Sequence, residues 1–201
     1  MCGIAGIIGL NTVLNQKDKE TVERMTSSLK HRGPDSKGFH FEEKCFLGNT
    51  RLAIIDSSER SNLPMSDSNE KIWICYNGEV SNFRELKKKY KLEEKYTFKG
   101  TSDTEVLIYL YKELGIDFIQ ELSGMFAFCL YDFHKSKCYL VRDFYGIIPL
   151  FYTFLNGKIY FASEIKAFLE IQEFKREINK ESIFHFFSLA YIPGNNTPYH
   201  N

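Results

Sequence analysis

Short strand-like apolar runs recur along this 201-residue sequence, and they constrain its fold more than any other feature. Runs of this kind are typical of β-strands. They cover Gly3–Ile8, Arg51–Ile55, Lys71–Tyr76, Phe126–Asp132, Cys138–Arg142, Leu150–Phe154 and Lys158–Ala162. The polar segment His134-Lys135-Ser136 and the pair Asn156-Gly157 indicate hairpin turns, because Asn and Gly tolerate the positive φ of a tight type I′ turn. The sequence therefore predicts antiparallel sheets.

Helical patterning separates groups of these strands. It covers Glu20–Leu29, Phe83–Tyr90 and, most clearly, Thr104–Leu114. Ser102 or Asp103 is placed to cap the start of the third helix, and Gly115 is placed to end it. Because the helices follow groups of strands and not each single strand, the order favours an α+β layered domain over a doubly wound parallel sheet.

The pattern changes near Asn179, where the sheet-rich part of the sequence ends. A helix is predicted over Lys180–Leu189, and the turn-rich segment Pro193–Pro198 follows it. A chain of 201 residues has enough material for one well-buried domain with a short tail. We therefore expect one domain over residues 1–170, and a linker or interrupted start of a second domain over residues 171–201.

The charge balance argues against nucleic acid as the main partner. Lys plus Arg and Asp plus Glu each number 26, so there is no basic excess to neutralise phosphates. The run Lys87–Lys89 is followed by Glu93 and Glu94, which favours a solvated helix face. The sequence has neither an apolar stretch of membrane-spanning length nor a secretory signal pattern, so we expect no membrane association and a cytoplasmic protein.

The cysteines need separate explanations, because they form an odd set without a C-x-x-C pair. This argues against a disulfide framework and against a zinc site, and no other ligand cluster suggests a metal. Cys75 and Cys129 lie inside apolar runs, where Cys behaves as a small buried hydrophobic residue. The full set is Cys2, Cys45, Cys75, Cys129 and Cys138.

Cys2 would be the N-terminal residue once Met1 is removed, which is a position that suits a catalytic nucleophile. A catalytic thiol needs a nearby base, because a free thiol with a pKa of about 8.5 is mostly protonated at neutral pH. The exposed α-amine, with a pKa of about 7.7 to 8.0, would be that base, so one residue would supply both groups. The apolar residues after Gly3 would hold the terminus in a core. The competing interpretation is an accidental Cys at a frayed end.

Several sequence motifs occur along the chain in the same order as in a known protein family. They are Met1-Cys2-Gly3-Ile4-Ala5-Gly6, His31-Arg32-Gly33-Pro34-Asp35, Asn49-Thr50-Arg51-Leu52-Ala53-Ile54-Ile55-Asp56, Tyr76-Asn77-Gly78-Glu79, Gly100–Glu105, Leu122–Phe128, Arg142-Asp143 with Gly146–Leu150, and Ala162–Ala167. Together they resemble the class II glutamine amidotransferase domain, and in particular that of glutamine-hydrolysing asparagine synthetase. The resemblance implies an N-terminal-nucleophile hydrolase fold, a four-layer αββα sandwich of two antiparallel sheets.

The resemblance also implies a role for each matching residue. Cys2 would attack the amide carbon of L-glutamine and form a thioester, which water resolves to L-glutamate. Asn77 and the backbone amide of Gly78 would form the oxyanion hole. Arg51 would bind the substrate α-carboxylate, and Asp103 would bind its α-ammonium. The rest of the substrate pocket would be Leu52, Ile54, Ile55 and Glu79.

Each of these residues has a plain structural alternative. Asn77-Gly78 would by itself be a β-turn after a strand, and Asp103 would by itself be a helix cap. Arg51 would by itself be a surface ion-pair partner. The motif that begins at His31 ends a helix naturally, so we assign it a loop-shaping role and not proton transfer.

The sequence departs from the family pattern in its length. It lacks the Ser-Gly-Gly-x-Asp-Ser phosphate loop of the synthetase domain, so residues 171–201 resemble only the truncated start of that domain. Glutamine hydrolysis would need no cofactor, and ATP and Mg²⁺ would belong to the missing C-terminal domain or to a synthetase partner chain. Ser81 stands where the family often has an aromatic residue. The alternatives in function are a catalytically silent glutamine-binding or partner-docking module, and hydrolysis of a different amide.

Overall fold

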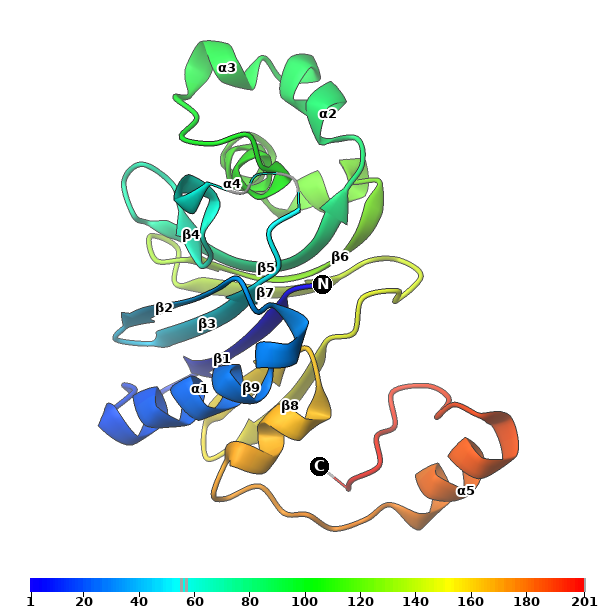
Figure 1. The fold of residues 1–201 in the computed structure, drawn as a ribbon. Helices are drawn as coiled ribbons and strands as arrows, with labels where there is room; N and C mark the ends of the chain where they lie inside the picture. Colours follow the sequence, from blue (N-terminus) through cyan, green and yellow to red (C-terminus); the bar gives the residue numbers. More distant parts are fainter. Residues whose placement is uncertain (55, 57, 201) are drawn as a thin grey trace.

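The computed structural model describes residues 1–54, 56 and 58–200. Two antiparallel sheets face each other and carry helices on their outer faces (Figure 1). Within the described residues, no helix combines the length and the apolar character that a membrane crossing requires. The predicted α+β sandwich with four layers is confirmed.

The first sheet holds the N-terminal strand at its centre. Its strand order is β2-β3-β1-β9-β8, with antiparallel neighbours throughout. The strands are β1 (Gly3–Gly9), β2 (Ser36–Glu42), β3 (Cys45–Arg51), β8 (Phe151–Leu155) and β9 (Lys158–Ala162). Because β1 pairs on both sides and all its residues are buried, the residue that precedes it is anchored to the core.

The second sheet supplies the opposite wall, in the order β4-β5-β6-β7. Its strands are β4 (Met65–Ser66), β5 (Ile72–Val80), β6 (Gly124–Asp132) and β7 (Lys137–Arg142). β5 and β6 are the two central strands, and they pair with each other along their whole length. The apolar side chains between the two sheets form a core layer that includes Ile4, Leu47, Cys75, Cys129 and Phe161.

The helices cover the two outer faces. α1 (Gln16–Ser28) and the 3₁₀ helix η4 (Ile165–Glu170) pack on the first sheet, and α4 (Asp103–Leu114) packs on the second. The remaining elements are η1 (Lys30–Arg32), η2 (Glu59–Ser61), α2 (Phe83–Lys89), α3 (Leu92–Lys95), η3 (Gly115–Glu121) and α5 (Lys180–Leu189). Figure 1 shows α5 beyond β8, set apart from both sheets.

The strand predicted over Arg51–Ile55 was wrong, and so was the start of the first helix. The strand is β3, which ends at Arg51, because the apolar residues after it do not face a core: Ile54 is 74% exposed. Ile55 lies outside the described residues. α1 begins at Gln16 and not at Glu20, because Asn15 forms a capping box with Asp18. The strand β2 was missed, since its residues are mostly only half-buried.

The turns and later helices agree with the sequence predictions. Ser136, Asn156 and Gly157 have positive φ in the two hairpins, and Gly115 ends α4 with φ 65°. The helix over Lys180–Leu189 is confirmed. The capping alternative for Asp103 is wrong, because Asp103 is the first residue of α4 and Ser102 stands at the cap position without a capping hydrogen bond.

Asn49 joins the two sheets through its fully buried side chain. Its Nδ2 donates to the Gly3 carbonyl over 3.2 Å and to the Thr50 carbonyl over 3.1 Å. Its Oδ1 accepts from the Tyr76 backbone amide over 3.0 Å. One side chain on β3 therefore contacts both β1 and β5, and the two strands approach each other where it lies.

We expect Asn49→Ala to lower the free energy of unfolding by about 2 to 3 kcal/mol, because the buried Tyr76 amide would lose its partner. Urea denaturation followed by circular dichroism measures this change. Asn11→Ala, at an exposed position, is the control and should stay within about 0.5 kcal/mol of the unchanged chain. Equal effects of the two substitutions would contradict a bridging role for Asn49.

Candidate active site

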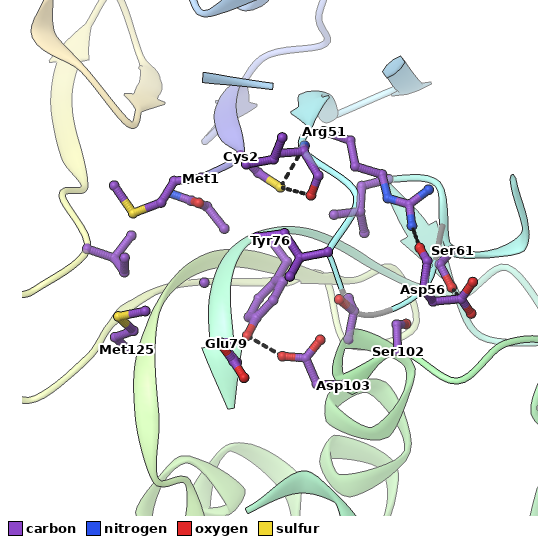
Figure 2. Close-up of a pocket in the computed structure, with 17 residues that line it drawn as sticks. Met1, Cys2, Arg51, Asp56, Ser61, Tyr76, Glu79, Ser102, Asp103 and Met125 are labelled. Atoms are coloured by element: carbon purple, nitrogen blue, oxygen red, sulfur yellow. Dashed lines mark hydrogen bonds between the residues drawn. The ribbon is translucent and has the colours of Figure 1, made fainter. Parts of the chain in front are cut away.

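A pocket with a cavity volume of about 100 Å³ opens where β1, β3 and β5 meet the start of α4 (Figure 2). Its lining contains every predicted site residue that the structure describes, namely Cys2, Arg51, Leu52, Ile54, Asn77, Gly78, Glu79 and Asp103. The predicted site residue Ile55 lies outside the described residues. The lining also contains residues that were not predicted: Met1, Asp56, Ser61, Leu63, Tyr76, Ser102, Thr104, Met125 and Ile148.

Hydrogen bonds hold both the side chain and the backbone carbonyl of Cys2. Its Sγ accepts from the Leu52 amide over 3.4 Å and donates to the Leu52 carbonyl over 3.7 Å. Its backbone carbonyl accepts from Arg32 Nε over 2.9 Å. Burial raises the pKa of the thiol, and the Leu52 hydrogen bond and the positive charges of the N-terminus and Arg51 offset only part of this rise. While Met1 is attached, the thiol is therefore the favoured form at neutral pH.

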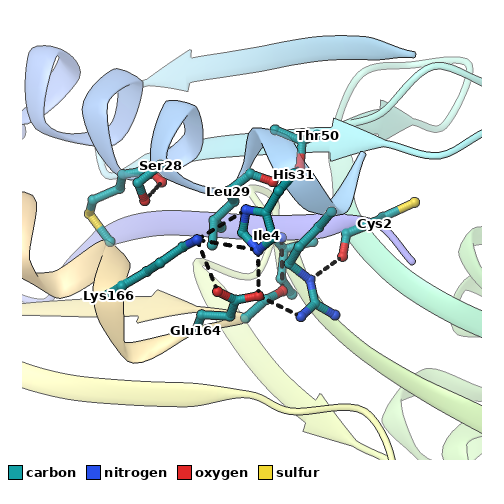
Figure 3. A network of polar contacts seen from close by, with 11 residues as sticks. Cys2, Ile4, Ser28, Leu29, His31, Thr50, Glu164 and Lys166 are labelled. Atoms are coloured by element: carbon teal, nitrogen blue, oxygen red, sulfur yellow. Dashed lines mark hydrogen bonds and ion pairs between the residues drawn. The ribbon is translucent and has the colours of Figure 1, made fainter. Parts of the chain in front are cut away.

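Ion pairs around Glu164 fix the Arg32 side chain, and Figure 3 shows Glu164 with His31 and Lys166. Arg32 Nη1 contacts Glu164 Oε1 over 2.8 Å, and His31 Nε2 reaches the same oxygen over 2.9 Å. Lys166 Nζ lies 3.4 Å from Glu164 Oε2. Burial tends to raise the pKa of Glu164, but Arg32, His31 and Lys166 outweigh burial and lower it to about 2. The carboxylate therefore stays ionised at neutral pH and orients the guanidinium toward Cys2.

Arg51 is 7% exposed, and neutral oxygens hold its guanidinium. Nη1 donates to the Ser58 carbonyl over 3.0 Å and to Asn62 Oδ1 over 2.9 Å, and Nη2 donates to the Asp56 carbonyl. Within the described part of the chain it makes no ion pair with a carboxylate, so the alternative of a surface ion-pair partner was wrong. A fixed guanidinium of this kind keeps its positive charge available to an anionic ligand.

The Asp56 carboxylate ties the Arg51 loop to the segment before α4. It accepts from the Ser58 amide over 2.9 Å, the Ser61 hydroxyl over 2.8 Å and the Thr101 amide over 2.9 Å. The hydrogen bond from Thr101, with those from Ser58 and Ser61, holds the pKa of Asp56 well below its usual range. Asp56 thus connects the two segments that carry Arg51 and Asp103.

Asn77 and Gly78 lie inside β5, so the β-turn alternative was wrong. The Asn77 side chain is 0% exposed, and neither its Nδ2 nor its Oδ1 has a hydrogen-bond partner among the described residues. A buried amide left unpaired is costly, which makes it a candidate for ligand contact. Gly78 has φ 147°, and a Cβ there would lie 2.2 Å from the Met125 carbonyl oxygen, so only glycine fits.

Asp103 projects from the start of α4 to the end of β5. Its Oδ2 accepts from the Tyr76 hydroxyl over 2.6 Å and from the Val80 amide over 2.9 Å. Burial raises the pKa of Asp103, and the hydrogen bonds from Tyr76 and Val80 counteract part of the rise. The pocket therefore combines a buried cation, Arg51, with a carboxylate, Asp103, which suits a ligand that carries both charges.

A family model described as "Glutamine amidotransferase domain" matches residues 1–201. The chain belongs to the class II glutamine amidotransferase domain family. Among its relatives, asparagine synthetase [glutamine-hydrolyzing] 1 of Bacillus subtilis is 38% identical over 96% of this chain and 30% of the relative. The asparagine synthetase [glutamine-hydrolyzing] of Zea mays is 39% identical over 83% of this chain and 28% of the relative. The chain thus spans less than a third of the length of these two relatives.

Solved structures confirm the fold of this glutamine amidotransferase domain. The glutamine phosphoribosylpyrophosphate amidotransferase of B. subtilis, complexed with ADP and GMP, matches with a TM-score of 0.68. The match covers 83% of this chain and 43% of that one, at 22% identity. A structure titled as the allosteric regulatory enzyme of purine biosynthesis matches with a TM-score of 0.69 over 84% of this chain and 43% of that one, also at 22% identity.

We expect the Cys2 thiol to react slowly with iodoacetamide in the chain that keeps Met1. Because burial raises the pKa of this thiol, the pH midpoint of its alkylation should lie above the ordinary value of about 8.5. Peptide mass mapping of alkylation across a pH series measures the midpoint. The Cys2→Ala chain gives the background from the other thiols, and a midpoint at or below the ordinary value would contradict the burial argument.

Proposed function

We propose that this domain hydrolyses L-glutamine to L-glutamate and ammonia through a thioester on Cys2. The observation that carries the proposal is the pocket itself. The Cys2 thiol, the unpaired Asn77 amide and the opposite charges of Arg51 and Asp103 line one cavity. A free amino acid carries a carboxylate and an ammonium group together, so this pair of charges supports an amino-acid substrate over an amide without them.

In the proposed binding step, Arg51 pairs with the α-carboxylate of glutamine and Asp103 pairs with its α-ammonium. The side-chain amide then reaches Cys2, with Leu52, Ile54 and Glu79 around the substrate. We keep Ile55 in this proposed set on the family resemblance alone. Fixing both charges of the substrate orients its amide carbon toward the thiol, which converts a bimolecular encounter into an oriented reaction.

In the proposed chemistry, removal of Met1 frees the α-amine of Cys2, which accepts the thiol proton. The thiolate forms a C–S bond to the amide carbon, and the Asn77 amide and the Gly78 N–H donate to the oxyanion. The α-ammonium returns the proton to the leaving nitrogen, the C–N bond breaks, and ammonia departs. Water then attacks the thioester, which releases glutamate and restores the thiol. Apart from the substrate and water, the protein supplies every group in these steps, so the proposal includes no cofactor.

The proposal extends to the use of the released ammonia. The two relatives described above are named as asparagine synthetases, so we propose that the ammonia serves an amidotransfer of that type. A further domain or a partner chain would carry out that step and bind ATP and Mg²⁺. Residues 1–170 would be the glutaminase and residues 171–201 the passage to the synthetase part, in a cytoplasmic protein.

One observation favours a second candidate, a catalytically silent module that binds glutamine or docks onto a partner. Met1 lines the pocket, and its peptide bond occupies the nitrogen that would act as the base. A native protein that retained Met1 would therefore lack the proposed proton acceptor. The intact mass of the native chain distinguishes the two candidates, because only removal of Met1 is compatible with the proposed catalysis.

We expect Cys2→Ala to abolish glutamate release from glutamine, because the variant has no atom that can form the thioester. The assay is glutamate production by the purified chain, with loss of Met1 verified by mass. Cys138→Ala is the matched control, since Cys138 is also half-buried but does not line the pocket. Full activity of Cys2→Ala would contradict the proposed mechanism.

We expect Asn77→Ala to lower kcat by about 10² to 10³-fold, the usual loss for one oxyanion-hole donor, with a much smaller change in KM. Steady-state kinetics with glutamine separates the two parameters. The Asn77 amide would contact the reacting oxygen most strongly when negative charge develops there, so the effect should fall on kcat. A rise in KM with unchanged kcat would assign Asn77 to ground-state binding instead.

A further inference from the structure

Tyr76 makes a short hydrogen bond that the proposed chemistry does not use. Its hydroxyl donates to Asp103 Oδ2 over 2.6 Å, and both residues are buried (Figure 2). Tyr76 lies on β5 directly before Asn77, whereas Asp103 begins α4. The bond therefore links the strand with the oxyanion donors to the helix with the acidic group.

We propose that Tyr76 is a positioning residue that holds the Asp103 carboxylate for the ammonium group of the substrate. This inference rests on the proposed function, because it takes glutamine as the ligand and Asp103 as the group that binds its ammonium. Tyr76 itself need not touch the substrate. Its effect passes through Asp103.

The hydrogen-bond pattern explains how Tyr76 acts. Oδ2 of Asp103 receives both the Tyr76 hydroxyl and the Val80 amide, so Oδ1 keeps acceptor capacity for a ligand. Two donors from β5 fix the rotation of the carboxylate. A side chain held in this way loses little conformational freedom when the ligand binds, and that favours affinity.

The same bond favours the charged form of the carboxylate. Burial raises the pKa of Asp103, and the Tyr76 hydroxyl opposes this rise by donating to the ionised form. Without the hydroxyl, a larger fraction of Asp103 would be protonated and unable to pair with an ammonium. The ionisable residues that line the pocket with Asp103 are Met1, which carries the terminal amine, Cys2, Arg51, Asp56, Tyr76 and Glu79. Among the described residues, Tyr76 is the one whose side chain hydrogen-bonds Asp103.

α4 offers a matched control for this interaction. The hydroxyl of Tyr111 donates to Asp132 Oδ2 over 2.8 Å, which is a second buried Tyr–Asp pair between α4 and the same sheet. Neither residue of this pair lines the pocket. Loss of the Tyr111 hydroxyl should therefore cost stability as loss of the Tyr76 hydroxyl does, but it should leave ligand binding unchanged.

The test measures binding directly in the full chain that carries Cys2→Ala, so that turnover is not needed. Calorimetry gives the Kd of glutamine and of glutaramate, which keeps the carboxylate and the amide but has no amine. Tyr76→Phe should weaken glutamine binding about tenfold, as expected for a hydrogen bond to a charged group, and leave glutaramate binding unchanged. Tyr111→Phe should change neither. An unchanged affinity for glutaramate also shows that the pocket of the Tyr76→Phe chain is intact.

A pH series supplies a readout that a purely structural role would not move. Glutamine binding should weaken as the pH falls through the pKa of Asp103. In Tyr76→Phe this loss of binding should set in at a higher pH, because the pKa of Asp103 would be higher. In Tyr111→Phe the pH at which binding weakens should not change. Asp103→Asn should bind glutamine weakly, and its affinity should no longer fall as the pH is lowered through this range.

Specific outcomes overturn the inference. If Asp103→Asn weakens glutamine binding but Tyr76→Phe does not, the proposed function stands and the role of Tyr76 fails. If Tyr76→Phe weakens glutamine and glutaramate equally, Tyr76 supports the pocket as a whole and does not position Asp103. If the Cys2→Ala chain binds no glutamine, or binds glutamine and glutaramate equally whether or not Asp103 is replaced, the proposed ammonium site fails and this inference fails with it.

Discussion

The side chain of Asn49 links the two sheets directly beside the pocket, and the geometry of the pocket depends on this link. Its amide bonds reach the Gly3 carbonyl on β1 and the Tyr76 amide on β5. These are the residues directly beside Cys2 and Asn77. A displacement of either strand would therefore change the distance between the thiol and the unpaired amide. The position of the candidate nucleophile thus depends on a buried polar contact between strands and not only on apolar packing.

The sequence predicted most of the fold but misplaced the strand that carries Asn49. Apolar runs and turn residues identified β1, β6, β7, β8 and β9, and helical spacing identified α4. β3 was misplaced because its second half is Asn49, Thr50 and Arg51, which are polar but buried. A periodicity argument assigns such residues to the surface. Their partners lie in other elements, so nothing local in the sequence indicates that they are buried.

The same limit applies to the site. The family pattern identified residues that would contact the substrate, and the structure places the described ones around one pocket. It did not identify residues that act through others. Arg32 pairs with Glu164 across 132 positions of sequence, and Tyr76 pairs with Asp103 across 27. Both Arg32 and Tyr76 lie within motifs of the family pattern, so the sequence marked them, but only the folded chain shows which group each one contacts.

The nine-residue strand β5 presents adjacent residues to different layers of the sandwich. Tyr76 packs in the core layer under α4, whereas Cys75, one position earlier, lies between the sheets. Because side chains alternate along a strand, Asn77 is on the same face of β5 as Cys75. Inserting one residue into β5 upstream of Tyr76 would exchange these faces, whereas changing the length of the preceding turn would not, provided that the pairing with β6 is kept. During evolution, length changes should therefore be tolerated in the turn between β4 and β5 and rejected within the strand itself.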